Sequence, residues 1–583
     1  VAIGQQSMAD ATSASKNVAI GQKTGEKLTL ASGSVIVGWE AGATLTEAHH
    51  NTYIGAEAGK LATSATQNVG IGRQAYGSAG TATGYANVAV GNQALKVVTS
   101  SIRNVAIGFQ AGAAKTTGTP DVLIGAYAGG GISTQGANVI IGTYAGQNTT
   151  SDKGLFLGYQ SGYYATGDGN VYMGYQSGYG NSSTNNGTYN TAIGYEAMEL
   201  VQDADENVAV GSQAMRDNTS GDGNTSVGTN ALYRNTTAHH NVAVGHRAMF
   251  TSTTAAQNVA VGKGALYDLT EGDDNVAVGK SAGADLNTGH KNIAIGTDAM
   301  RLATTAHSSV AIGYQALDST TLGSENVAIG AYAGQALVGT TSSVYGGFST
   351  FIGHTAGYQI TGNVSYGGNT MVGHAAGYAA TGADRSTGLG ASALYYADGA
   401  KYNTAVGRVA GAYAKGTGST HVGDSSGYQI SGNYNTSVGF GALSGASSGT
   451  GYGTAAQNVA IGRDSLANVT SAGSNVAIGY DAGNAHTTGD DNVYIGTSAG
   501  KASTTAAGNV AIGKDAMKIG AQDSSNGGQN SVVGYGAYVD GTGQRNAILG
   551  YRAAYTSTSA NSNVAIGYEA GQKNTTGDSN VFI

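Results

Sequence analysis

The chain has 583 residues, of which 97 are glycine, one is proline and none is cysteine, and its net charge is −8 with 11% charged residues. Glycine without a three-residue period excludes collagen, and so few charges exclude charge-driven disorder. The acidic balance gives no reason to bind nucleic acid or an anionic membrane surface, the lack of cysteine excludes thiol chemistry, and no run of 18 apolar residues predicts membrane insertion.

A five-residue motif recurs from the first residue to the last. The chain opens with Val1-Ala-Ile-Gly4, and Asn-Val-Ala-Ile-Gly follows at 17–21, 326–330 and 563–567. There are about 33 complete copies, and most of their closing glycines are 17 residues apart. A fixed period of this kind is typical of a solenoid-like array and not of a series of unrelated domains.

Each motif predicts a short β-strand that ends at the glycine. Val18 and Ile20 are typical of its two aliphatic positions, and a spacing of two places both side chains on the same face of a strand. We expect this pair to line the core and the residue between them, often alanine as at Ala19, to point outward. A small, uncharged outer face would suit a packed subunit interface, so we expect a homo-oligomer, most simply a homotrimer.

The closing glycine predicts a corner where a Cβ would obstruct the chain. A small residue follows three positions later, as at Ala58, and the next position carries glycine, as at Gly59, or leucine or methionine, as at Leu95 and Met300. We interpret this segment as a second short strand. The rest of each unit consists of small polar residues that suit tight turns.

Asparagine begins most of the motifs, as at Asn17, Asn87 and Asn326. Asparagines at the same place in stacked coils could form a hydrogen-bonded ladder. Alternatively, the geometry of the turn alone could favour this residue. The sequence supports both interpretations equally.

Three longer units interrupt the period, near 331–353, 440–462 and 514–534. Loops that project from a rigid scaffold often carry binding residues, so their aromatic side chains and those of a neighbouring loop are candidate surface contacts. These candidates are Tyr345, Phe348, Tyr366 and Tyr452. Tyrosines directly after the corner glycine, such as Tyr159, could form a second contact row or serve simply as good strand residues.

No motif predicts catalysis, a cofactor or a metal. The pairs His49-His50 and His239-His240 lack the spacing of a chelating site, and the aspartates in turns, such as Asp222, lack the calcium-binding nonapeptide pattern. The glycines follow the coil period and form no phosphate-binding loop. We therefore expect a protein that is not an enzyme.

The tandem motif resembles the head repeats of trimeric autotransporter adhesins of the YadA type and the shaft repeats of phage tail fibres. The strings 190–197, Asn-Thr-Ala-Ile-Gly-Tyr-Glu-Ala, and 575–580, Thr-Thr-Gly-Asp-Ser-Asn, are similar to both. The resemblance covers essentially the whole chain. It implies a left-handed parallel β-roll, three chains side by side, and attachment to a cell surface. The unit is longer than that of the adhesin heads and no stalk heptads are visible, which favours a fibre shaft.

Together these patterns predict an all-β parallel β-solenoid of about 34 coils of about 17 residues. We expect residues 1–583 to form one continuous array, an excerpt of a longer chain. The expected function is an extracellular fibre shaft, on a virion or a cell, that presents an attachment function. The alternatives are a trimeric adhesin that binds directly through its repeats and an ice- or polysaccharide-binding solenoid. The expected partners are other copies of the chain and a cell-surface glycan or protein.

Overall fold

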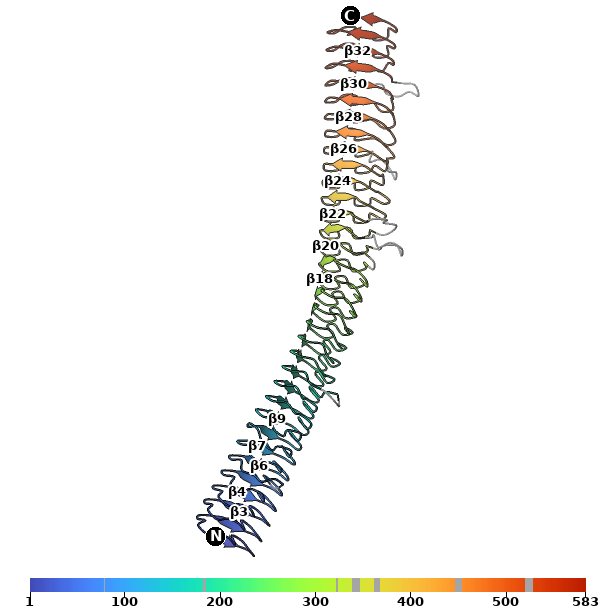
Figure 1. Ribbon diagram of the computed structural model, residues 1–583. Coiled ribbons are helices and arrows are strands. Elements are labelled where there is room, and N and C mark those ends of the chain that lie inside the picture. The colour runs from blue at the N-terminus through green and yellow to red at the C-terminus, as the bar shows by residue number, and fades with distance from the viewer. Residues whose placement is uncertain are drawn as a thin grey trace. The chain divides into compact units, whose positions relative to one another are not determined.

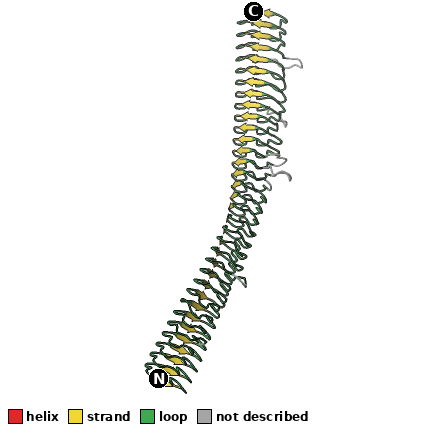
Figure 2. Cartoon of the chain, in the orientation of Figure 1, coloured by secondary structure: helices red, strands yellow, loops and turns green. Residues whose placement is uncertain are grey.

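The computed structural model describes residues 1–77, 79–181, 185–320, 323–337, 347–360, 367–445, 453–519 and 528–583. The protein is an all-β parallel β-solenoid with about 17 residues per turn, which confirms the expected fold class. Two compact units are present, Val1–Thr288 and Gly289–Ile583. Among the described residues, each turn contributes one strand and there is no helix (Figures 1 and 2).

The strands are very short, with three residues in all but the first and the last. The strands of the first unit are β1 (Ala2–Ile3), β2 (Val18–Ile20), β3 (Val35–Val37), β4 (Thr52–Ile54), β5 (Val69–Ile71), β6 (Val88–Val90), β7 (Val105–Ile107), β8 (Val122–Ile124), β9 (Val139–Ile141), β10 (Leu155–Leu157), β11 (Val171–Met173), β12 (Thr191–Ile193), β13 (Val208–Val210), β14 (Thr225–Val227), β15 (Val242–Val244), β16 (Val259–Val261) and β17 (Val276–Val278). Those of the second unit are β18 (Ile293–Ile295), β19 (Val310–Ile312), β20 (Val327–Ile329), β21 (Thr350–Ile352), β22 (Thr370–Val372), β23 (Thr387–Leu389), β24 (Thr404–Val406), β25 (Thr420–Val422), β26 (Thr436–Val438), β27 (Val459–Ile461), β28 (Val476–Ile478), β29 (Val493–Ile495), β30 (Val510–Ile512), β31 (Ser531–Val533), β32 (Ala547–Leu549), β33 (Val564–Ile566) and β34 (Val581–Phe582). Within each unit a strand pairs in parallel with the next one along the chain, and equivalent positions lie opposite each other, as Ala209 of β13 does to Ser226 of β14.

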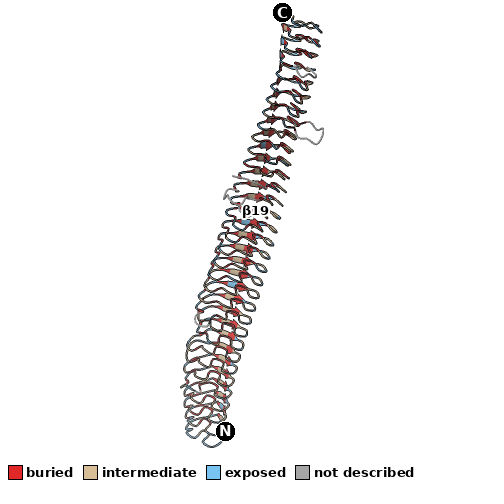
Figure 3. Ribbon diagram, turned by 90° about the vertical axis from the view of Figure 1, so that its right-hand side faces the viewer, coloured by how far each residue is buried: buried red, intermediate tan, exposed pale blue. Residues whose placement is uncertain are grey.

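The two faces of each strand are the reverse of the sequence-based expectation. Ala19, the middle residue of β2, is completely buried, whereas Ile20 beside it is 38% exposed and Val18 is half-buried. The same pattern recurs along both units, with buried residues concentrated at the strand centres (Figure 3). The alternation was predicted correctly but its direction was wrong, because the interior between stacked turns is too narrow for two aliphatic side chains from every strand.

Large side chains fill the interior from different positions in different turns. Where the strand centre is large, as at Tyr53, the fourth residue after the corner is usually glycine, as at Gly59. In many turns with alanine at the centre, as at Ala192, that position instead carries a large residue, as at Met198. A Cβ built on Gly59 would lie 2.7 Å from Cδ2 of Tyr53, so the two large residues exclude each other.

The closing glycine forms the predicted corner. In Gly211 φ is +140°, a conformation that disfavours residues with a side chain, and a Cβ there would lie 2.6 Å from the carbonyl oxygen of Gly228 in the next turn. The prediction of a second strand after the corner is wrong for the described residues, which form hydrogen-bonded turns there. The second and fourth residues after the corner, such as Gln93 and Leu95, have φ of 61° and 49°, and this left-handed geometry is incompatible with a strand.

The packing rule can be tested by exchanging the two large positions of one turn. We expect Gly59→Leu alone to destabilise the array by about 1–3 kcal/mol, because it overpacks the interior against Tyr53. Adding Tyr53→Ala should recover most of that loss, since the double variant has the same arrangement as the turn of Ala192 and Met198. Chemical denaturation of the wild type, both single variants and the double variant measures this coupling. Additive effects of the two substitutions would contradict the rule.

Candidate functional site

The most extensive functional feature of each unit is an exposed aliphatic face formed by the outer residues of its strands. We define this aliphatic face as the first and third residues of each strand, such as Val259 and Val261 of β16. These residues are half-buried or exposed, and parallel pairing aligns Val259 with Val276 and Val261 with Val278 in β17. Two rows of side chains, mostly β-branched, therefore lie next to each other at the surface of each unit. The sequence analysis assigned these residues to the core and so missed this surface.

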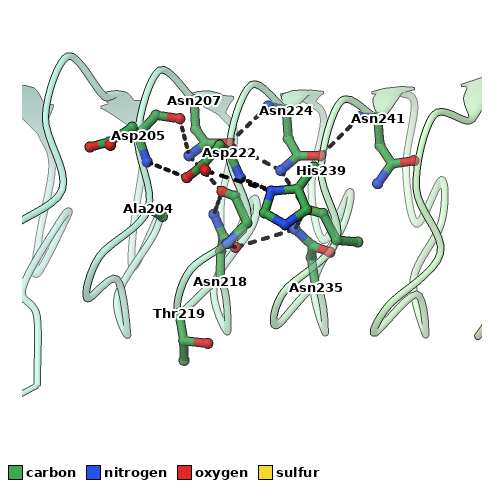
Figure 4. Close-up of polar contacts among 12 residues, drawn as sticks. Ala204, Asp205, Asn207, Asn218, Thr219, Asp222, Asn224, Asn235, His239 and Asn241 are labelled. Carbon is green, nitrogen blue, oxygen red and sulfur yellow. Dashed lines mark hydrogen bonds and ion pairs between the residues drawn. The ribbon is translucent and has the colours of Figure 1, made fainter.

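A buried asparagine ladder lies at the start of the strands and holds them in register. The side-chain oxygen of Asn207 accepts a hydrogen bond from the backbone N–H of Asn224 at 2.8 Å, and that of Asn224 accepts one from Asn241 at 2.9 Å (Figure 4). The amide of Asn224 also donates to the carbonyl oxygen of Ala238 at 2.8 Å. Of the two interpretations left open by the sequence, the structure therefore shows the ladder.

A second ladder lies two residues before the asparagines and is solvent-accessible. The backbone N–H of Asp205 donates to the carboxylate of Asp222 at 2.8 Å, and the N–H of Asp222 donates to Nδ1 of His239 at 3.0 Å (Figure 4). His49 accepts a hydrogen bond from the backbone of Ser32 in the same way, at 3.1 Å. These aspartates and histidines thus satisfy backbone donors between turns. Among the described residues no three His, Asp or Glu side chains are grouped as a metal site would require.

Aromatic side chains stack along the turns in several exposed rows. After the corner glycine, the ring centroids of Tyr159 and Tyr175 are 5.3 Å apart, as are those of Tyr175 and Tyr195. Another row, five residues after the corner, includes Tyr358 and Tyr378 at 5.0 Å. The stacking follows from the register, because equivalent residues of neighbouring turns lie directly above one another. Tyr159, Tyr175 and Tyr195 are exposed and Tyr358 and Tyr378 are half-buried, so parts of these rings are accessible to a ligand.

Of the four aromatic contacts predicted from the sequence, the structure places one. Phe348 precedes β21 and is 56% exposed, in agreement with a surface position. Tyr345, Tyr366 and Tyr452 lie outside the described residues. The contact role of the four side chains therefore stays a prediction.

A buried ion pair and a buried histidine lie inside the solenoid. Lys115 and Asp121 form an ion pair, with Nζ 2.6 Å from Oδ2 and both side chains fully buried, and burial raises the pKa of the Asp121 carboxyl. His421 occupies the centre of β25, where its Nδ1 lies 2.7 Å from the hydroxyl of Ser437. Burial lowers the pKa of His421 to about 4. Neither group is accessible to a substrate, so both belong to the interior and form no reactive site.

Comparison with known proteins finds no matching family model, and no curated protein is significantly similar to the chain. Among the described residues there is no helix long and apolar enough to cross a membrane.

The buried His421 should make stability depend on pH. Between pH 6.5 and about 4 the unfolded chain binds a proton at this ring and the folded chain does not, so stability is lost as the pH falls. We expect His421→Met, which places at this strand centre the residue found at Met371, to remove this contribution. The stability of the variant relative to the wild type should increase by up to about 3 kcal/mol between pH 7 and pH 4. Denaturation at both pH values measures it, and a constant difference would contradict the prediction.

Proposed function

We propose that the chain is a segment of an extracellular fibre shaft, on a virion or a cell, in which three copies lie side by side and present an attachment function. Each copy is taken to be a left-handed β-roll, as the resemblance to adhesin heads and tail-fibre shafts implies. The observation that supports the proposal best is the continuous aliphatic face of each unit, which a monomer would leave exposed to water.

The size of the aliphatic face supports lateral association. Strands β1–β17 of the first unit, spaced by about 4.8 Å, would make a face about 80 Å long and about 10 Å wide, or roughly 800 Å². Monomeric soluble proteins rarely expose a contiguous apolar patch above about 300–600 Å². About 800 Å² per partner is the area of a standard stable interface. The second unit carries a similar face, in which strands β21–β26 have threonine as their first residue.

The composition of the face supports contact between copies of the same chain. Its residues are uncharged and mostly β-branched, as at Val244, Val261 and Ile295, and they form two parallel rows. A closed symmetric assembly in which every copy turns this face toward a common axis would bury all of the faces equally. The number three rests on the family resemblance.

The assembly can be tested with charged substitutions on the aliphatic face. The wild type should have a solution mass three times the 57.8 kDa of one chain by sedimentation equilibrium. We expect Val244→Glu with Val261→Glu to weaken association strongly, because four to six carboxylates would be buried without partners in the assembly. The matched control is Thr237→Glu with Thr254→Glu, which adds the same charges at exposed turn positions and should leave the mass unchanged. A monomeric wild type would refute side-by-side assembly.

The shaft role can be tested by electron microscopy of particles or cells that carry the intact protein, with an antibody against the array. A shaft should be labelled along a projecting fibre, between its base and its tip. Label confined to the interior of the particle or cell would contradict the proposal. This measurement is independent of the number of chains in the fibre.

A second candidate is an adhesin that binds directly through its repeats, and the exposed aromatic rows favour it. Many equivalent weak contacts along one array would reinforce one another through multivalency. The isolated array should then bind target cells by itself, and should lose binding when Tyr358 and Tyr378 are replaced by serine. A pure shaft segment would bind no more strongly than an unrelated fibre.

A further inference from the structure

The second position after the corner glycine normally carries a side chain that covers the surface between turns. In the first unit the amide of Gln93 donates to the side-chain oxygen of Gln74 at 2.8 Å, and the amide of Gln213 donates to the carboxylate of Glu196 at 2.8 Å. Both glutamines have left-handed φ values, 61° and 55°, so the position accepts a residue with a side chain.

Gly264 interrupts this row and opens a notch in the surface. It has the same left-handed conformation, with φ of +64°, but a Cβ built on it would meet no atom within 4 Å. The resulting notch has a volume of about 280 Å³, just below the range of about 300–1,000 Å³ of typical small-molecule pockets. It is lined by His246, Arg247, Lys263, Gly264, Tyr267, Ser281 and Ala284, all in the first unit. The space suits one ring-sized group.

The charged residues of the notch are positive and unpaired. Arg247 and Lys263 are exposed, and neither has an ion-pair partner among the described residues. No carboxylate lines the notch. Arg247 also lies over the ring of Phe250, 5.5 Å from its centroid, which holds the guanidinium beside the opening. In a chain with a net charge of −8, this local arrangement favours an anionic ligand.

An aromatic ring next to the notch has one uncovered face. Tyr233, Phe250 and Tyr267 stack in successive turns with centroids 5.2 Å apart. The stack ends at Tyr267 because the equivalent residue of the next turn is Ala284, and both of these residues line the notch. A ring face bordered by a small apolar residue is suited to the apolar face of a sugar ring.

A second notch in the chain has the same glycine but a different arrangement of charges. Gly536 occupies the equivalent position and borders a notch of about 270 Å³. There, however, Lys518 pairs with Asp515 at 3.1 Å, and Arg552 packs on the ring of Tyr555 at 4.4 Å. The Gly264 notch differs because its two cations have no carboxylate partners.

We propose that the notch at Gly264 binds an anionic saccharide, a sugar unit that carries a carboxylate or a sulfate. Arg247 and Lys263 would bind the anionic group, Tyr267 would stack on the sugar ring, and Ser281 would donate or accept a hydrogen bond. The site uses turn residues and none from the aliphatic face. The proposal does not depend on the shaft role, because binding and assembly are measured separately.

The test is a titration of the full-length chain with three fluorescent oligosaccharides of equal length, one sulfated, one composed of uronic acids and one neutral. We expect at least one of the two anionic probes to bind and the neutral probe not to bind. Comparison of the sulfated probe with the uronic-acid probe shows whether the site prefers sulfate or carboxylate. Arg247→Gln with Lys263→Gln should weaken binding by about tenfold or more. Gly264→Gln should weaken binding to a similar extent, because it fills the notch with the side chain that Gln93 and Gln213 have at this position and leaves every charge in place.

The control is Lys23→Gln with Arg73→Gln, which removes two positive charges at the same repeat positions elsewhere in the first unit and should leave binding unchanged. Equal thermal unfolding of Gly264→Gln and the wild type would show that the variant folds. Failure of both anionic probes to bind would overturn the proposal. Full binding by Gly264→Gln, or an equal loss in the control, would also overturn it, because either result would indicate general charge attraction and no site.

Discussion

The backbone contact between successive corner glycines is the constraint on which the rest of the structure depends. The carbonyl oxygen of Gly228 occupies the space where a Cβ of Gly211 would lie, so successive turns approach as closely as the backbone permits. This contact recurs at most of the corners and fixes each turn directly over the next. Equivalent side chains then stack on their own counterparts, which explains why the asparagine, aspartate–histidine and aromatic ladders all follow the same period.

The same close approach determines which side chains are inside. A turn of about 17 residues encloses room for alanine or serine at most strand centres and for only a few larger residues, from the strand or from the turns that follow it. The remaining aliphatic residues must lie outside, where they form a continuous apolar surface. Hydrogen bonds between turns therefore hold each unit together while part of its apolar surface stays exposed, and contact with other copies would bury that surface.

Much of the fold could be predicted from the sequence, because period, alternation and corner are local properties. The motif at 17–21 indicates a short strand that ends in a constrained glycine, and both features are present. The direction of the side chains could not be read from a single Val-Ala-Ile triplet, since either face could be internal. A signal was nevertheless available in the reciprocal sizes of Tyr53 with Gly59 and Ala192 with Met198, which only packed neighbours require. The cationic notch also had a sequence signal, a glycine at 264 in a row where most turns of the first unit carry a larger side chain, but its significance depends on knowing which residues of neighbouring turns are adjacent.

The ladder of Asn207, Asn224 and Asn241 makes the turns that carry it equivalent donors and acceptors for their neighbours. A whole repeat could therefore be duplicated or excised by recombination within the gene, and the new junction would contain the same bonds as the old one. Each such event would lengthen or shorten its unit by about 4.8 Å. The length of a unit can therefore evolve in small uniform steps, without changes to the residues of its interior.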